Sequence, residues 1–183
     1  MALSATMHHV VVGLSDVDRG VYETLDLRLA RHPSETARYL LTRLFAYCLS
    51  YEEGIAFSKA GLSSAEEPPV SIHDPTGVLL AFIDIGAPAA DRLHKASKAA
   101  KRVAVFTHDL TALRREAASR PIHKAEAIDV YRIDVALLDA LETKLARNVK
   151  LDLVRTDGEL YVTVDGSVRT GAIEHRMLLE ELG

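Results

Sequence analysis

The sequence of 183 residues predicts an α/β fold, with a central mixed β-sheet flanked by helices on both faces and antiparallel β-hairpins at the N- and C-terminal ends. Two observations favour this class. Strand-like and helix-like segments alternate between residues 78 and 148, and short strand pairs joined by turn sequences stand at both ends of the chain. A chain of this length is typical of one domain, here residues 1–183, with a core that needs no disulfide or structural metal.

The first 49 residues predict a hairpin followed by a helix. Ala5–Leu14 is rich in β-branched residues, a polar turn follows, and Val21–Ala30 alternates leucines with mostly polar side chains. The helix is expected to begin within His32–Glu35, where proline is tolerated and Ser34 can act as the cap. It is expected to end near Leu49, because apolar residues recur at helical spacing up to that position.

The next region is expected to supply the centre of the sheet. Ile55–Ser58 is a short strand candidate and Gly61–Pro69 a loop. Val70–His73 and Val78–Ile85 flank Asp74-Pro75-Thr76-Gly77, a sequence typical of a β-turn, so they predict a second hairpin. Since the longer strand is apolar on both faces, we expect it to be central in the sheet.

Helices and strands then alternate up to the C-terminal hairpin. We expect, in order, a helix at Pro88–Ala100, a strand at Arg102–Thr107, a helix at His108–Arg120, a strand at Ala127–Ile133, a helix at Val135–Asn148, and hairpin strands at Lys150–Thr156 and Glu159–Val164. Asp157-Gly158 is a favoured two-residue hairpin turn, and Asp165-Gly166 turns the chain once more.

Composition limits the classes of function. With 22 Lys and Arg against 26 Asp and Glu, the chain as a whole is not a polyanion binder, so nucleic-acid contact would need a local basic patch. Cys48 is the only cysteine, which excludes an intrachain disulfide framework and a four-cysteine zinc site. The apolar run 78–90 is too short for a membrane span and contains Asp84. Without a secretory signal at residues 1–15, we expect a cytoplasmic protein that does not associate with membranes.

The arrangement most suggestive of a site is a carboxylate at the end of an apolar strand. Asp84 closes the strand, and by strand alternation its side chain shares a face with Leu80 and Phe82. A carboxylate charge buried at this position is costly in free energy unless a nearby cation neutralises it. A metal ion would do so, but an ion pair with Lys95 or Lys98 on the following helix would do so equally well.

Several segments resemble the YaeQ family of small bacterial proteins. The resemblance runs from Met1 to about Val164, and its segments are Met1-Ala2-Leu3-Ser4-Ala5-Thr6, Arg31-His32-Pro33-Ser34-Glu35-Thr36, Glu67-Pro68, Phe82-Ile83-Asp84-Ile85-Gly86-Ala87-Pro88, Lys95-Ala96 and Phe106-Thr107. It implies a restriction-endonuclease-like fold of the PD-(D/E)XK nuclease type. In that superfamily two carboxylates on a mixed sheet hold a divalent metal, and a nearby lysine activates water. The cellular role of the YaeQ family is poorly defined.

Carried over by position, the resemblance implies three metal ligands and one amine. Glu35, Glu67 and Asp84 match the carboxylates, and the implied cofactor is Mg²⁺ or Mn²⁺. Lys95 or Lys98 would supply a relocated catalytic amine. Such a site would hydrolyse phosphodiesters by polarising the phosphate and lowering the pKa of a bound water.

The chain departs from the nuclease pattern at two positions. Gly86 occupies the place of the lysine in the (D/E)XK triplet, and Leu80 stands where relatives tend to have an aspartate. The first carboxylate of the pair is therefore missing, unless Asp74 replaces it. Asp74 also has an ordinary explanation, because aspartate is favoured at the first position of a turn.

The other candidate residues also have ordinary explanations. Glu35 in a first helical turn would be stabilised by the helix dipole, by about 0.3–1 kcal/mol. Glu67 lies beside another glutamate in a loop, where both are normally solvated. Lys95, Lys98 and Arg102 would share one helix face, which either contacts phosphates or is solvated.

Two functions of different classes follow from these observations. The first is a degenerate nuclease-like site that binds a nucleic acid or a protein partner without chemistry of its own; the alternative is a divalent-metal-dependent nuclease that hydrolyses phosphodiesters. A further, weaker hypothesis is that the terminal strands pair with a partner chain.

Overall fold

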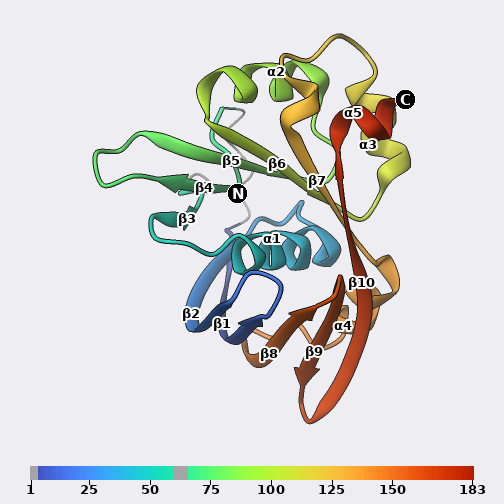
Figure 1. Ribbon diagram of the computed structural model, residues 1–183. Coiled ribbons are helices and arrows are strands. Elements are labelled where there is room, and N and C mark those ends of the chain that lie inside the picture. The colour runs from blue at the N-terminus through green and yellow to red at the C-terminus, as the bar shows by residue number, and fades with distance from the viewer. Residues whose placement is uncertain (1–3, 60–65) are drawn as a thin grey trace.

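The computed structural model describes residues 4–59 and 66–183, which form a mixed α/β fold with one large ten-stranded sheet (Figure 1). The sheet has the strand order β2-β1-β8-β9-β10-β7-β6-β5-β4-β3. The strands are β1 (Thr6–Asp16), β2 (Val21–Arg31), β3 (Ile55–Phe57), β4 (Val70–His73), β5 (Leu79–Ile85), β6 (Arg102–Thr107), β7 (Ile128–Ile133), β8 (Asn148–Thr156), β9 (Glu159–Val164) and β10 (Ser167–Met177). The helices are α1 (Ala37–Leu49), α2 (Ala90–Ala99), α3 (Leu110–Ala117), α4 (Val135–Glu142), α5 (Leu178–Leu182) and the short 3₁₀ helix η2 (Ala125–Ala127).

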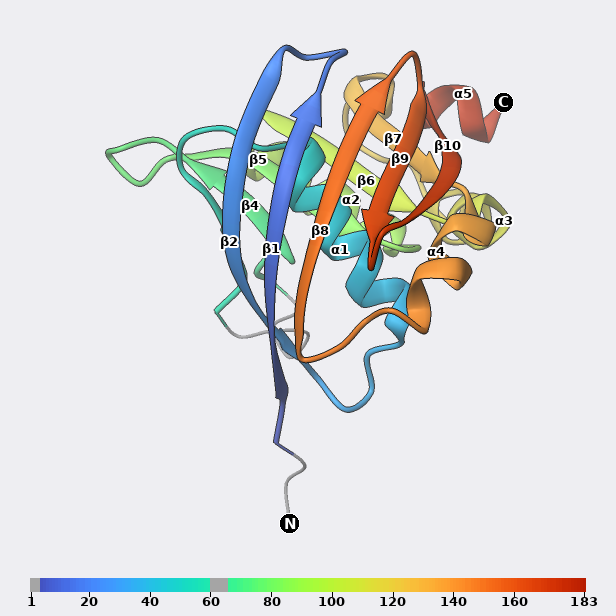
Figure 2. The ribbon, with the colours of Figure 1, turned by 90° about the horizontal axis from the view of Figure 1, so that it is seen from below.

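The two terminal hairpins form as predicted, but they are not separate ends of the sheet. β1 and β2 pair antiparallel, as do β8 and β9. β1 also pairs in parallel with β8, from His9 opposite Asn148 to Asp16 opposite Arg155. The N- and C-terminal hairpins therefore make one continuous four-stranded part of the sheet (Figure 2).

β10 joins this part to the central strands. Ser167–Ala172 pairs antiparallel with β9, and Ile173–Met177 pairs antiparallel with β7. The long strand thus belongs to both parts, and the sheet curves around α1 and is nearly closed (Figure 1). β10 and α5 follow the Asp165-Gly166 turn, and neither was predicted from the sequence.

Two hydrophobic clusters hold the layers together. The larger lies between the two parts of the sheet and includes residues of α1 and α4, among them Leu44, Phe45 and Leu138. The smaller lies on the other face of β5, β6 and β7, where α2, α3 and α5 contribute Leu93, Leu113 and Leu178. Helices on both faces of the central strands are thus confirmed.

Helix ends differ from the prediction for local reasons. α1 begins at Ala37 with Thr36 as its N-cap, whose side chain accepts a hydrogen bond from the Tyr39 amide, so the expected cap at Ser34 is wrong. The expected helix at 135–148 ends at Glu142, because the chain there turns toward β8. The Arg147 carbonyl already accepts a hydrogen bond from the His9 amide of β1.

The hairpin of β4 and β5 is confirmed, with a β-bulge that sequence alternation did not predict. Ile72 faces Ala81 but His73 faces Leu79, so one extra residue is inserted in β5. Leu80 consequently packs against the larger cluster, while Phe82 belongs to the smaller cluster beside α2. The expectation that Leu80 shares the face of Phe82 and Asp84 is therefore wrong.

Part of the predicted loop 61–69 lies outside the described residues. Within the described part of the chain, no helix is both long enough and apolar enough to cross a membrane.

Candidate functional site

Asp84 is buried at the end of β5 and is bound by an arginine. The residue is 3 % exposed, and its Oδ2 accepts a hydrogen bond from Arg92 Nε at 2.5 Å, while Oδ1 accepts one from the Ile85 amide at 3.1 Å. Burial raises the pKa of this carboxyl, and the Arg92 guanidinium opposes the rise. A cation neutralises the buried charge, as expected, but this cation is Arg92 in the first turn of α2, not Lys95 or Lys98.

The two lysines of α2 are exposed, and Asp84 is paired with Arg92 instead. Lys95 lies 3.2 Å from Asp91, one helical turn earlier, and its side chain is 78 % exposed. Asp91 also accepts a hydrogen bond from Arg120 at 2.8 Å. Lys98 is exposed as well. Because Asp91, Lys95 and Lys98 are spaced by three and four residues, they form a solvent-facing stripe on α2.

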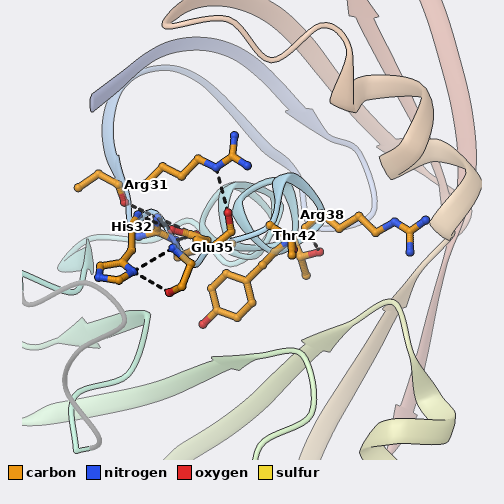
Figure 3. A network of polar contacts seen from close by, with 10 residues as sticks. Arg31, His32, Glu35, Arg38 and Thr42 are labelled. Atoms are coloured by element: carbon orange, nitrogen blue, oxygen red, sulfur yellow. Dashed lines mark hydrogen bonds and ion pairs between the residues drawn. The ribbon is translucent and has the colours of Figure 1, made fainter. Parts of the chain in front are cut away.

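Glu35 lies before α1, not in its first turn, and it also binds an arginine. Its carboxylate accepts hydrogen bonds from Arg43 Nε and Nη2, both at 3.1 Å, and from the His32 amide at 3.2 Å. Figure 3 shows Glu35 beside His32 at the start of α1, with Arg38 directed elsewhere. Burial raises the pKa of Glu35, and Arg43 counters the rise. The interpretation of Glu35 as a residue of the first helical turn, stabilised by the helix dipole, is therefore wrong.

Glu67 contacts the same arginine as Asp84, but through its backbone. The Glu67 carbonyl accepts a hydrogen bond from Arg92 Nη2 at 3.2 Å. Its carboxylate accepts hydrogen bonds from Ser58 Oγ at 2.9 Å and from the Lys59 amide at 3.3 Å, beyond the end of β3. Glu67 is thus a half-buried residue that ties its loop to β3, not a solvated one.

Tyr39 of α1 lies in the electrostatic field of both ion pairs. Burial raises the pKa of Tyr39 to about 12; the charges of Asp84 and Glu35 add to the rise, and those of Arg43 and Arg92 oppose it. The charges of both ion pairs therefore act on the same tyrosine. Tyr39, Arg43 and Arg92 were not predicted as site residues, although an arginine within the apolar stripe of α1 was a detectable signal for a buried partner.

The carboxylates as arranged do not fit a divalent cation. Both buried carboxylates already bind guanidinium groups, and the described residues contain no group of three or more His, Cys, Asp or Glu that could hold a metal ion. Gly86 has a φ of +82°, a conformation that a residue with a side chain adopts only at a cost. The backbone at this turn thus disfavours a lysine at position 86.

Asp74 lies at the opposite end of β5 from Asp84. Its Oδ1 accepts hydrogen bonds from the Thr76 and Val78 amides, both at 2.9 Å, and from the Thr76 hydroxyl at 2.6 Å. These donors lower the pKa of the exposed carboxyl, the Thr76 hydroxyl most. The interpretation of Asp74 as a turn residue is confirmed, and the structure does not bring it to Asp84.

A pocket of about 580 Å³ lies beside the ion pair of Asp84 and Arg92. Its apolar lining residues are Phe82, Ala89, Ala96 and Ala99. The charged lining residues are Glu66, Asp91, Arg92 and Lys95. We call this space the α2 pocket. The Arg92 guanidinium carbon lies 5.2 Å from the centre of the Phe82 ring, so the arginine forms part of the wall.

Comparison with known proteins identifies the family. A family model described as "YaeQ protein" matches residues 1–171. The chain is 31% identical over 169 residues to the protein described as "Uncharacterized protein YaeQ" of Escherichia coli (strain K12), covering 90% of this chain and 92% of that relative. It is 32% identical over 167 residues to the Salmonella typhi protein of the same description, covering 89% and 91%.

Solved structures agree. The crystal structure of the YaeQ protein from Xanthomonas axonopodis pv. citri superposes with a TM-score of 0.84 at 29% identity, covering 95% of this chain and 99% of that one. The YaeQ protein from Pseudomonas syringae gives a TM-score of 0.82 at 28% identity, covering 93% and 95%. On this likeness of sequence and of fold, the chain belongs to the YaeQ family.

Proposed function

We propose that this chain is a degenerate member of the PD-(D/E)XK nuclease-like folds that binds the sugar-phosphate backbone of a nucleic acid without cleaving it. The observation that carries the proposal is the exposed basic surface on α2, immediately beside a carboxylate whose charge is neutralised by an arginine. The first feature supports binding, and the second speaks against metal chemistry.

The case against catalysis rests on Arg92 and Arg43. A divalent ion at Asp84 would have to displace Arg92, whose guanidinium also holds the Glu67 carbonyl. An ion at Glu35 would have to displace Arg43, which also donates a hydrogen bond to the Ala30 carbonyl at 2.7 Å. Separating either buried pair leaves an arginine without its charged partner, which costs several kcal/mol, roughly 3–5 in comparable cases.

The surface that supports binding is a local excess of positive charge. Residues 91–124 contain nine Lys and Arg against three Asp and Glu, although the whole chain has more acidic than basic residues. We define the α2 basic face by its exposed cations, which are Lys95, Lys98, Lys101, Arg120 and Lys124.

Two contacts place residues 120–124 beside α2. Arg120 donates a hydrogen bond to Asp91, and the His123 amide donates one to His94 Nδ1 at 3.2 Å. Asp91 partly neutralises Lys95 and Arg120, since both contact it. The face nevertheless keeps a positive balance of charge. Lys and Arg groups that neutralise phosphates gain free energy by releasing condensed counterions.

Two other functions, a metal-dependent nuclease and a protein-binding module, have less support, and the experiment below can detect the first of them. The nuclease needs a metal where the two arginines lie. A protein partner would draw on the apolar walls of the α2 pocket, but the charge excess around the pocket favours a polyanion.

The experiment is fluorescence anisotropy with labelled oligonucleotides in EDTA, over a series of salt concentrations. The variant K95Q/K98Q removes two cations from the α2 basic face. The matched control R28Q/K150Q removes two exposed cations from the outer face of β2 and β8.

We expect metal-independent binding by the wild type and the control. For K95Q/K98Q we expect weaker binding and a salt slope smaller by about two, roughly one for each lost phosphate contact. No binding by the wild type, or equal losses in the two variants, would overturn the proposal. Cleavage that needs Mg²⁺ or Mn²⁺ and is lost in D84A would establish the nuclease instead.

A further inference from the structure

Arg92 lines the α2 pocket and is held in place by contacts with β5 and with the loop before β4. Its Nε is bound by the buried Asp84, its Nη2 donates to the Glu67 carbonyl, and the group lies over Phe82. The Arg92 side chain still keeps 23 % of its surface exposed. An arginine fixed in this way has already lost its side-chain conformational entropy in the free protein. A group that stacks on it therefore binds without the cost of ordering that side chain.

The α2 pocket has the size and the walls for one flat apolar group. Its volume of about 580 Å³ lies within the usual range for small-molecule sites, about 300–1,000 Å³. The methyl groups of Ala89, Ala96 and Ala99 line it, and small side chains leave room for a ring next to the arginine. A planar ring can stack on a guanidinium group as it does on an aromatic side chain.

The charges at the pocket decide which part of a nucleic acid would enter it. Glu66 and Asp91 line the pocket, and their carboxylates would repel a phosphate. Lys95 also lines the pocket, but its side chain is 78 % exposed, so it and Lys98 can receive phosphates at the solvent-facing rim. A neutral base is therefore favoured inside the pocket, with its neighbouring phosphates outside, on the lysines.

We infer that the α2 pocket holds one unstacked nucleobase against Arg92, and that the chain is consequently specific for single-stranded nucleic acid. This inference rests on the proposed function, because it assigns a substrate class to the same surface. A base within a duplex is paired and stacked on both faces, so it cannot enter the pocket without the cost of extrusion. A single strand supplies unstacked bases without that cost.

The test compares three ligands at equal total phosphate concentration and three variants. The ligands are a single-stranded 12-mer, the same strand with all bases replaced by abasic residues, and the corresponding duplex at matched phosphate content. R92K keeps a cation beside Asp84 but removes the guanidinium plane. A99F fills the pocket from an exposed position while leaving both residues of the ion pair unchanged, and A118F adds the same ring at the exposed C-cap of α3 as the control.

We expect the wild type and A118F to prefer the single strand over both other ligands. In R92K and A99F we expect the affinity for the single strand to fall about tenfold, in line with the usual contribution of stacking one base. Affinity for the abasic strand and the salt slope should change little. Circular dichroism and thermal unfolding check that each variant is folded.

The outcomes separate this inference from the proposed function. The wild type could bind the duplex, the abasic strand and the ordinary single strand with equal affinity, while K95Q/K98Q still weakens binding. That result would overturn the base pocket but not the backbone binding. A single-strand preference that survives in A99F would also overturn the pocket. If no oligonucleotide binds at all, the proposed function itself fails.

Discussion

Arg92 Nε on α2 lies 2.5 Å from Asp84 Oδ2 at the end of β5, and the same guanidinium holds the backbone of Glu67. Two of the three predicted carboxylate residues are therefore joined by an arginine rather than by a metal. The third, Glu35, is joined to its own arginine, Arg43. Four experiments beyond those above follow from these ion pairs and from the ends of the elements that position them.

The response to divalent metal should distinguish an arginine-filled site from a metal site. We expect no increase in the melting temperature of the wild type when Mn²⁺ or Mg²⁺ is added, because the Asp84 oxygen is already bound by Arg92. Thermal unfolding of the wild type and of D84A, with and without each metal, measures this. Stabilisation of the wild type that disappears in D84A would contradict the prediction and favour the nuclease.

The buried pair of Glu35 and Arg43 should be far more important for stability than a surface pair. We expect E35A to lower the free energy of unfolding by about 3–5 kcal/mol, because it leaves a buried guanidinium without its charged partner. R38A is the control, since Arg38 and Asp139 are 44 % and 43 % exposed, and such pairs contribute about 0–1 kcal/mol. Urea unfolding measures both.

A double variant tests whether the cost belongs to the pair. E35L/R43M replaces both charges by apolar groups and should recover much of the stability lost in E35A. If the double variant instead loses the sum of the two single losses, the two residues act independently and the interpretation of Glu35 as an ion-pair partner is wrong.

The beginning of α1 depends on Thr36 and not on Ser34. We expect T36A to destabilise the protein by about 1 kcal/mol, because it removes the side-chain oxygen that accepts a hydrogen bond from the Tyr39 amide. In S34A the free energy of unfolding should change by less than about 0.5 kcal/mol, as for most exposed substitutions. A larger loss in S34A than in T36A would show that the helix begins earlier than Ala37.

The β-turn between β4 and β5 should give a pH-dependent contribution to stability. The pKa of Asp74 is lowered in the folded state by the Thr76 hydroxyl and by the Val78 and Thr76 amides. The unfolded chain therefore binds the proton first, so the contribution is present above the ordinary pKa of 3.8 and is lost as the pH falls through the lower, folded value.

Unfolding of wild type and D74A between pH 7 and pH 2 measures this contribution. The difference in their free energies of unfolding should be largest at neutral pH and should diminish below pH 3.8. D74N keeps an oxygen acceptor that does not ionise, so its stability relative to D74A should show no such pH dependence. A difference between wild type and D74A that grows on acidification would contradict the prediction.

Much of the fold could be predicted because its signals are local. The turns Asp74-Pro75-Thr76-Gly77 and Asp157-Gly158 fix hairpins through the conformations of a few adjacent residues. Alternation of apolar and polar residues marked β2, and apolar residues at helical spacing marked α1. The bulge at Leu79–Leu80 escaped detection, because alternation assumes a strand without insertions.

The candidate site was predicted only in part. That Asp84 would be buried near a cation followed from its place at the end of an apolar strand. The identity of that cation did not follow, because Arg92, Lys95 and Lys98 lie on one short helix. Only the packing of this helix against β6 and Phe82 decides which side chain reaches the strand. Glu35 and Arg43 illustrate the same problem. A charged residue in an apolar stripe predicts that a buried partner exists, but it does not show which residue that partner is.

The sequence by itself determined the order of the elements, the local turns and an acid that needs an opposite charge, since these depend on residues close together in the chain. The tertiary structure alone decided that β1 lies beside β8, that β10 joins the two parts of the sheet, and that arginines neutralise both buried carboxylates. The physical reason is that strand pairing and ion pairing across long stretches of chain depend on the packing of all the elements together, and no short segment of sequence encodes that packing.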